Sequence, residues 1–238
     1  MPDDHALRVV PQSVRRQVEK KLRDAIGAGR FAPGEHLSDR MLCDLFGVSR
    51  GVIREAVRLL EAEGLVTVVP NRGPFVAFLS VEEASQIYEV RAVLEALAGE
   101  GFAERASSDE LAELRAVFEE LAATRPGSDR TVLLGIKRRF YDVLLRGCRN
   151  EYAARMLDQL LNRNALLRAT TLSDPARLPQ TVAEIRRIVE AIERRDREGA
   201  RNACREHVSQ AARVALRILN EQAQQAGHRA ATGLPASA

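Results

Sequence analysis

Three arginines in the segment VSRGVIREAVRLLEAEGLV, residues 48–66, have the type and the spacing to bind an anion. Arg50, Arg54 and Arg58 stand four residues apart, so a helix would place their guanidinium groups in one row. A guanidinium group pairs with O6 and N7 of guanine in the major groove of DNA, or with a phosphate. The row is therefore a candidate DNA-binding surface.

The elements around this row must hold it in place. The opposite side of the predicted helix carries the apolar residues Ile53, Ala56, Val57 and Leu60. This side must pack within its own domain. Two earlier helices are predicted, over residues 12–28 and from the candidate N-cap Ser38 to Gly47. A tight turn at Gly47 and Ser49 gives the spacing of a helix-turn-helix, whose later helix is free to enter a groove.

The residues after Gly64, LVTVVPNRGPFVAF, have the pattern of a hairpin. Residues 65–69 and 75–78 favour strands, and residues 70–74 between them contain two prolines and a glycine. The tip of this hairpin would carry Arg72. Three helices followed by a hairpin form a winged helix-turn-helix domain, which we predict for residues 1–79.

Helical periodicity dominates from Ser80 onward, where Glu83 completes a capping box. We predict six helices, over residues 81–106, 109–125, 131–148, 151–171, 178–196 and 198–222. The fold class is therefore mainly α, with an N-terminal winged helix-turn-helix and a C-terminal all-α helical bundle at residues 80–222. Residues 223–238 have little to bury, and we predict a disordered tail there.

The composition is that of an ordinary globular protein. The chain has 238 residues, 45% of them hydrophobic, and a net charge of +3, so two domains are expected and the charge alone does not establish an anionic partner. No apolar run approaches the roughly 20 residues that span a bilayer, and we expect a cytoplasmic protein. The motifs HExxH, GxxxxGK, GxSxG and GxGxxG are absent from the sequence, so catalysis is not expected.

Residues 10–78 resemble the GntR superfamily of bacterial transcription regulators. The resemblance rests on PGEHLSDRMLCDLFGVSRGVIREAVRLLEAEGLV and on the glycine-containing segment PNRGPFV. It implies DNA contacts from an arginine of the second helix, two arginines of the third helix and a glycine of the wing. By position these are Arg40, Arg50, Arg54 and Gly73.

Two further residues are added on physical grounds. Arg72 lies at the predicted wing tip, and Ser49 with the helix N-terminus suits a phosphate. The sequence departs from the family after Arg50, because Gly51 and Val52 stand where most relatives have Thr-Pro or two hydroxyl residues. This departure puts one phosphate contact in doubt.

An alternative interpretation assigns the arginines no partner outside the chain. They would then solvate the surface and pair with acidic neighbours, namely Asp39, Glu55 and Glu61. The ordered succession of turn, cap, arginine row and basic hairpin favours DNA binding over this alternative. Arg58 is different, because a surface role alone explains it.

Residues 81–222 resemble the helical effector-binding and dimerisation domain called FCD. Many such domains hold a divalent metal through an Asp, a His four residues later, and one His on each of the last two helices. The matching positions here are Lys137, Tyr141, Ile185 and His207. One imidazole cannot supply the three or four ligands that a transition metal requires, so we predict no metal and no cofactor.

The same positions predict a site for an acidic effector. Lys137 beside His207 would present positive charge to a carboxylate, and Tyr141 would add a hydroxyl donor. Further candidate lining residues on other helices are Arg91, Arg163 and Asn164. In the alternative, Lys137 extends to solvent while Tyr141 and Ile185 fill a collapsed cavity.

These observations predict a homodimeric regulator that binds double-stranded DNA at a two-fold operator and responds to a small organic acid. Most relatives repress and are released by ligand, so we expect a repressor. One alternative is a constitutive DNA-binding protein whose helical domain only dimerises. Another is an all-α enzyme with a vestigial DNA-binding domain, which His207 alone supports poorly.

Overall fold

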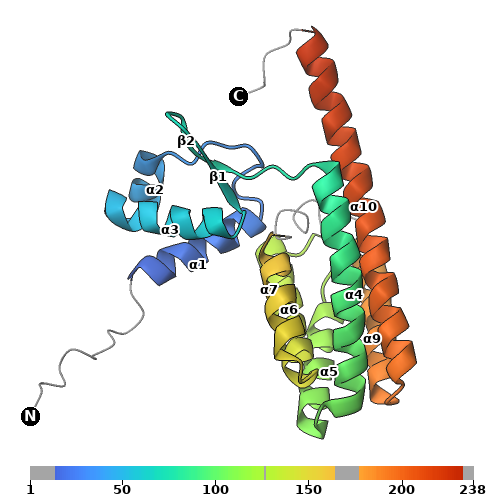
Figure 1. Ribbon diagram of the computed structural model, residues 1–238. Coiled ribbons are helices and arrows are strands. Elements are labelled where there is room, and N and C mark those ends of the chain that lie inside the picture. Colours follow the sequence, from blue (N-terminus) through green and yellow to red (C-terminus); the bar gives the residue numbers. More distant parts are fainter. Residues whose placement is uncertain (1–13, 126, 164–176, 233–238) are drawn as a thin grey trace, which may run out of the picture. The chain divides into compact units, whose positions relative to one another are not determined.

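The computed structural model describes residues 14–125, 127–163 and 177–232, with the backbone alone at residues 162–163 and 225–232 (Figure 1). The chain divides into two compact units, Met1–Phe78 and Leu79–Ala238. Each unit is described by itself below. None of the described helices is long and apolar enough to cross a membrane.

The N-terminal unit is built from three helices and a two-stranded sheet. Its elements are α1 (Val14–Gly27), α2 (Asp39–Phe46), α3 (Arg50–Ala62), β1 (Val66–Val69) and β2 (Gly73–Val76). Its core includes Leu22, Ile26, Leu42, Ile53 and Leu60, all without exposed surface. The predicted winged helix-turn-helix fold is confirmed.

Local sequence explains how α2 begins and ends. The hydroxyl of Ser38 accepts a hydrogen bond from the backbone N–H of Met41 at 3.2 Å, which satisfies a free N–H group at the helix start. Gly47 ends α2 in the left-handed conformation, with φ of 65°. The chain can therefore turn sharply between α2 and α3.

The wing is an antiparallel hairpin in which Val66 pairs with Val76 and Val69 pairs with Gly73. The second strand begins two residues earlier than predicted, because Gly73 and Pro74 continue the pairing and only residues 70–72 form the turn. Gly73 has φ of 89°, a conformation that side chains with a Cβ rarely adopt.

The C-terminal unit is a bundle of helices. Those within the described residues are α4 (Val81–Arg105), α5 (Ser108–Ala122), α6 (Arg130–Gly147), α7 (Glu151–Arg163), α9 (Arg177–Glu193) and α10 (Arg197–Thr232). The long helices α4 and α10 lie side by side (Figure 1). A Cβ on Gly99 of α4 would lie 2.5 Å from Sγ of Cys204 on α10, so only glycine permits this close approach. The all-α bundle is as predicted.

Two helix ends differ from the prediction or lie beyond the described residues. A disordered tail is predicted from residue 223, whereas the described backbone of residues 223–232 continues α10 to Thr232. Alanine and glutamine, which recur in this stretch, are good helix formers. The predicted helix over residues 151–171 is described as far as Arg163, and its remainder lies outside the described residues.

Candidate nucleic-acid interface and effector site

The arginine row is present on the solvent side of α3. Arg50, Arg54 and Arg58 are all exposed, whereas the opposite face of the helix is buried in the core of the N-terminal unit. The amphipathic pattern therefore directs the guanidinium groups outward. A partner in solution can reach them without any change of the fold.

Two of the three arginines have acidic neighbours, as the surface alternative predicts. Arg54 Nε lies 3.1 Å from Asp39 Oδ2, and Arg58 Nη1 lies 3.0 Å from Glu55 Oε1. Both arginine side chains are more than two-thirds exposed, so each pair contributes about 0–1 kcal/mol. Such weak pairs do not prevent an exchange of the carboxylate for a nucleic-acid group.

Arg50 differs from its two neighbours in the row. It forms no ion pair with any residue that the structure describes. Glu61, the third acidic neighbour predicted to neutralise the row, instead accepts a hydrogen bond from the backbone N–H of Val68 at 3.3 Å. The surface alternative therefore accounts for Arg54 and Arg58 but leaves Arg50 uncompensated.

Ser49 is the N-cap residue of α3, but its side chain makes no capping hydrogen bond. The hydroxyl and the free N–H groups of the first helical turn are thus all available at one end of the helix. Such a helix end is suited to a phosphate. Arg40 is exposed on α2, the preceding helix.

The wing places a second group of cationic and aromatic side chains at the surface. The guanidinium carbon of Arg72 lies 5.3 Å from the centre of the Phe75 ring, and the ring of His36 lies 4.9 Å from the same centre. Sequence reasoning assigned no role to His36 or Phe75. The pairing of His36 with β2 brings them together, and no local motif signals it.

In the helical unit, charged and polar side chains are buried together. Those within the described residues come from α4, α6, α9 and α10, and are Arg91, Glu95, Lys137, Arg177, Thr181, Glu184 and His207. Buried charges are costly unless they are paired or bind a ligand. The partners of each charge within the bundle therefore matter for its stability.

The first part of this buried group is centred on Glu95. Arg91 donates to Glu95 Oε1 from Nε at 2.8 Å and from Nη2 at 2.6 Å, and the hydroxyl of Tyr141 donates to Oε2 at 2.9 Å. Burial opposes the charge on Arg91, but Glu95 outweighs burial and raises the pKa of Arg91. Arg91 thus remains a cation inside the bundle.

The second part is centred on Glu184. Arg177 donates to both carboxylate oxygens, at 2.6 and 2.7 Å, and Nδ1 of His207 lies 2.7 Å from Oε2. Burial raises the pKa of Glu184, but the hydrogen bonds from His207 and Arg177 outweigh burial and lower it to about 2. Burial, together with the charge of Lys137, lowers the pKa of His207 despite the opposing effect of Glu184. A neutral imidazole of His207 that donates from Nδ1 to an ionised Glu184 is consistent with the lowered pKa of both groups.

Lys137 is buried, with 8% of its surface exposed. This burial argues against the part of the alternative in which its ammonium group extends to solvent, whereas Tyr141 and Ile185 are both buried, as the rest of that alternative requires. Its positive charge contributes to the lowered pKa of His207. Thr181 is buried as well, and its hydroxyl has no hydrogen-bond partner among the described residues.

The residues at the family's metal positions do not fit a metal. Lys137 offers an ammonium group and Ile185 a hydrocarbon side chain, neither of which is a ligand. Glu184, next to Ile185, has both oxygens occupied by Arg177, with His207 on one of them. Within the described residues there is no group of three or more side chains able to hold a metal ion.

The structure brings together four of the six predicted effector residues: Arg91, Lys137, Tyr141 and His207 are buried in the bundle. The side chain of Arg163 and the whole of Asn164 lie outside the described residues. Sequence reasoning missed the two carboxylates. Glu95 follows Arg91 by four residues and Glu184 follows Arg177 by seven, spacings that place each pair on one helix face and that a search for charge pairs would find.

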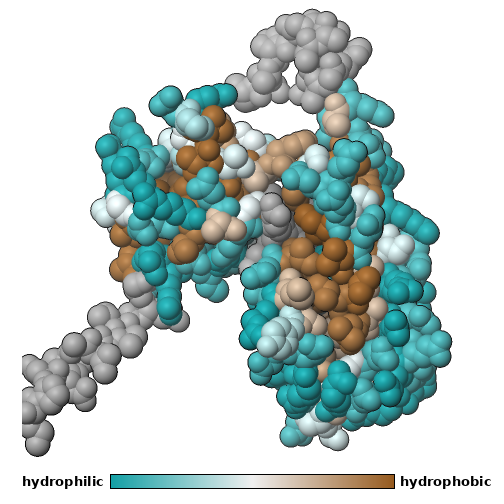
Figure 2. Space-filling model, viewed as in Figure 1, coloured by the Kyte–Doolittle hydropathy of each residue, from teal (hydrophilic) through white to brown (hydrophobic). Residues whose placement is uncertain are grey.

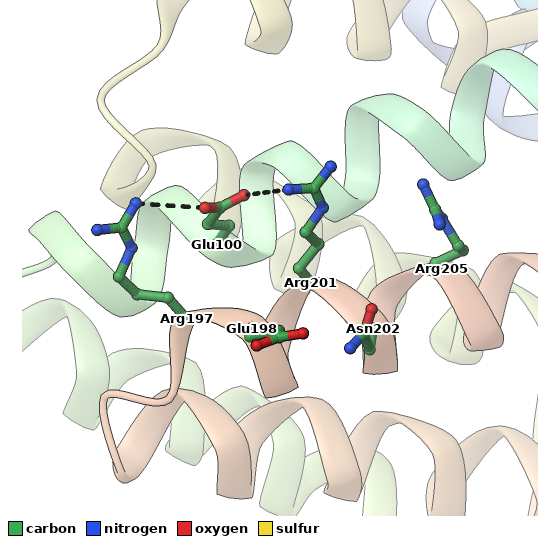
Figure 3. A pocket seen from close by; sticks show the side chains of 6 residues that line it. All are labelled: Glu100, Arg197, Glu198, Arg201, Asn202 and Arg205. Carbon is green, nitrogen blue, oxygen red and sulfur yellow. Dashed lines mark hydrogen bonds and ion pairs between the residues drawn. The ribbon is translucent and has the colours of Figure 1, made fainter.

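A shallow depression on the outside of α4 and α10 is a different kind of site (Figure 3). It is lined by Glu100, Arg197, Glu198, Arg201, Asn202 and Arg205. Glu100 accepts from Arg197 at 3.3 Å and from Arg201 at 3.4 Å. Because its charges largely compensate one another at the surface, we assign it no ligand.

A winged helix-turn-helix with outward arginines, joined to an all-helical unit with buried charges, defines a two-domain DNA-binding transcription regulator. The model for the family "Bacterial regulatory proteins, gntR family" matches residues 14–76, and the model for the FCD domain matches residues 86–210. The chain belongs to the GntR family of transcription regulators and carries an FCD domain. This is a family of regulators rather than enzymes.

Relatives and solved structures agree with this assignment. The chain is 28% identical over 196 residues to the galactonate operon transcriptional repressor of Escherichia coli (strain K12), covering 74% of this chain and 85% of that protein. It is 29% identical to the HTH-type transcriptional regulator YdhC of Bacillus subtilis (strain 168), covering 86% and 92%. A GntR regulator from Rhodococcus sp. RHA1 superimposes with a TM-score of 0.73 at 25% identity, covering 88% and 99%.

Proposed function

We propose that the chain is a repressor that binds a two-fold operator in double-stranded DNA as a homodimer and leaves it when a small organic acid binds. The observation that carries the proposal is the outward row of Arg50, Arg54 and Arg58 on α3, in which Arg50 forms no ion pair with any described residue. Such a regulator acts on chromosomal DNA in the cytoplasm.

In this proposal the DNA contacts divide by chemistry. Arg50 and Arg54 read base edges in the major groove, and Arg54 exchanges Asp39 for DNA. Ser49 and the start of α3 bind a phosphate, and Arg40 and Arg72 approach the backbone from α2 and the wing. Gly73 lets the wing turn close to the duplex.

An apolar face on the helical unit supports the homodimer. Figure 2 shows a continuous hydrophobic area over α4 and α7, which lie against each other. Its exposed residues are Val90, Val93, Leu97, Tyr152 and Met156. A patch of this kind marks an interface, and the same patch on a second copy gives a two-fold pair. Two-fold symmetry of the protein requires a two-fold operator.

The buried cations support an acidic effector. Lys137 is held inside the bundle at a position where relatives of the family place a metal ligand, and Arg91 and Arg177 are buried in the same bundle, each beside a carboxylate that an acid could displace. Two relatives are named for operons of sugar acids, galactonate and gluconate, and both names describe those proteins. We extend to this chain only the class, a small organic acid.

Release from DNA requires the acid to bind the free and the DNA-bound arrangements with different affinity, since equal affinity would shift nothing. A coupling of roughly 1–3 kcal/mol is ordinary for such switches. Ser80 caps α4 through the backbone N–H of Glu83 at 3.1 Å, two residues after the N-terminal unit ends at Phe78. A connection this short favours mechanical coupling over a flexible linker.

The homodimer is tested by light scattering on the full chain. Val93→Glu and Met156→Glu place charges on the α4/α7 face and should give monomers, whereas Glu113→Lys on α5 should leave the dimer intact. A dimer that persists in both apolar-face variants would refute this interface.

The effector is tested by thermal shift against sugar acids, hydroxy acids and dicarboxylic acids. Lys137→Ala should abolish the response of the wild type without loss of DNA binding. Arg139→Ala, two residues later on α6 and exposed, is the matched control and should respond normally. If the wild type responds to no acid, the constitutive alternative, in which the helical unit only dimerises, replaces the proposal.

A further inference from the structure

A third backbone segment pairs with the wing hairpin, and the sequence does not predict this pairing. Residues 35–37, between α1 and α2, pair with β2: the backbone N–H of Leu37 donates to Pro74 O at 2.8 Å, and that of Val76 donates to Glu35 O at 2.9 Å. His36 therefore stands opposite Phe75, and the pair exchanges no backbone hydrogen bond of its own. Side chains of such a pair approach each other more closely than those of a hydrogen-bonded pair.

Alternation along these strands directs His36 and Phe75 to the solvent side. Leu37 follows His36, Val76 follows Phe75, and both are buried in the core of the N-terminal unit. Successive side chains of a strand point to opposite faces, so His36 and Phe75 point away from the core. His36 is exposed and Phe75 is half-buried. The imidazole ring is thus displayed on the outer face of the wing rather than used in the core.

Phe75 acts as a platform for two side chains that can meet an anion. The guanidinium group of Arg72 lies over its ring, as a cation–π contact requires, and the imidazole of His36 lies against the same ring. The carboxylate of Glu35 is turned away, because Oε2 accepts from the backbone N–H of Ala32 at 2.7 Å. The platform therefore joins a donor from the α1–α2 loop to a donor from the wing tip.

His36 also lies against the wing glycine. A Cβ on Gly73 would be 3.1 Å from His36 Nε2, closer than most contacts of this kind. A DNA backbone that approaches Gly73 must therefore approach this imidazole nitrogen too. We propose that His36 is a further DNA-binding residue, which contacts a backbone phosphate beside Arg72, and that Phe75 is the positioning residue for both.

This contact is independent of base sequence, because it is made to the phosphate backbone. It extends the proposed DNA interface from the recognition helix and wing tip to the loop before α2. It also explains why an aromatic side chain occupies a partly exposed position of β2. Its loss should therefore affect all DNA duplexes alike.

The test compares the affinity of the full chain for two duplexes of equal length, an operator obtained by selection from random DNA and a scrambled version. His36→Ala should weaken both by a similar factor of about ten to a hundred, the size of one hydrogen bond to a charged group. His36→Lys should restore the affinity and steepen its dependence on salt by about 0.9 in the log–log slope. Unchanged affinity of His36→Ala, or a loss confined to the operator, would overturn the proposal.

The platform is tested with a conservative pair. Phe75→Leu keeps an apolar strand residue but removes the ring, and should weaken both duplexes and reduce the salt slope, whereas Phe75→Tyr keeps the ring and should bind as the wild type. Val68→Thr, an isosteric change on an exposed residue of β1, is the control and should have no effect. If Phe75→Leu binds as tightly as the wild type, the platform does not exist. Loss of all DNA binding by the wild type would instead contradict the proposed function.

Discussion

The two units of this protein treat positive charge in opposite ways. In the N-terminal unit, Arg50, Arg54 and Arg72 are exposed, and their contacts within the chain are weak or lacking among the described residues. In the helical unit, Arg91 and Arg177 are buried and each holds a carboxylate at 2.6 Å. An exposed cation is ready for an external anion, whereas a buried pair must exchange one partner for another. The first arrangement suits rapid, salt-dependent binding of DNA, and the second suits selective binding of a small ligand.

The largest effect is expected where the buried arrangement is broken. Glu184→Ala leaves Arg177 buried without its carboxylate and should lower the free energy of unfolding by about 3–5 kcal/mol, measured by chemical denaturation. Glu113→Ala removes a carboxylate from an exposed pair with Arg146 and should change stability little. Similar stabilities for the two variants would mean that burial makes no difference to these pairs.

Acid should weaken the same pair. The pKa of Glu184 is about 2 in the folded protein and 4.5 ordinarily, so its contribution is fully present above pH 4.5 and is lost as the pH falls toward 2. The shift corresponds to about 3 kcal/mol. The difference in stability between the wild type and Glu184→Gln should therefore shrink between pH 6 and pH 3. A difference that stays constant across this range would contradict an ionised Glu184.

Replacing a glycine should have opposite effects on stability in the wing, at Gly73, and in α3, at Gly51. Gly73→Ala forces a side chain into a positive φ and toward His36, and should lower stability by about 1 kcal/mol and weaken DNA binding. Gly51→Ala, in α3 where a Cβ would make only an ordinary contact with Ser49 Oγ at 3.9 Å, should instead raise stability by about 0.5–1 kcal/mol. A raised midpoint of thermal unfolding for Gly73→Ala would show that the wing turn is not strained.

The smallest effect sharpens the account of the exposed arginines. Asp39→Asn removes the neighbour of Arg54 and should tighten DNA binding by at most about fivefold, because an exposed pair contributes about 0–1 kcal/mol. Glu55→Gln, beside Arg58, should have no effect, since a surface role explains that arginine. Weaker binding by Asp39→Asn would show that the carboxylate orients Arg54 for DNA rather than competing with it.

The sequence predicts the exposed site better than the buried one. The row on α3 follows from a four-residue spacing and an apolar opposite face, both of which are local. The second strand of the wing begins two residues before its predicted start, because Gly73 and Pro74 read as turn residues although they pair with β1. The sequence gives His36 no role, because its partner Phe75 is 39 residues away and only the fold joins them.

In the helical unit, the family positions indicate Lys137, Tyr141 and His207, but not the carboxylates that bind Tyr141 and His207. Glu95 and Glu184 pair across helices with Tyr141 and His207, and periodicity gives no sign of contacts between helices. The burial of Lys137 likewise depends on its neighbours in the bundle. What the sequence supplied was the identity of the charged residues, and what it lacked was which of them meet.

The most direct test of the central claim is a titration of operator DNA with the wild type and with Arg50→Ala, Arg54→Ala and Arg58→Ala, followed by fluorescence anisotropy. Arg50→Ala and Arg54→Ala should each weaken operator binding by about 1–3 kcal/mol while circular dichroism shows an unchanged fold, and Arg58→Ala should bind almost as the wild type. Unchanged operator affinity in both Arg50→Ala and Arg54→Ala would contradict the account.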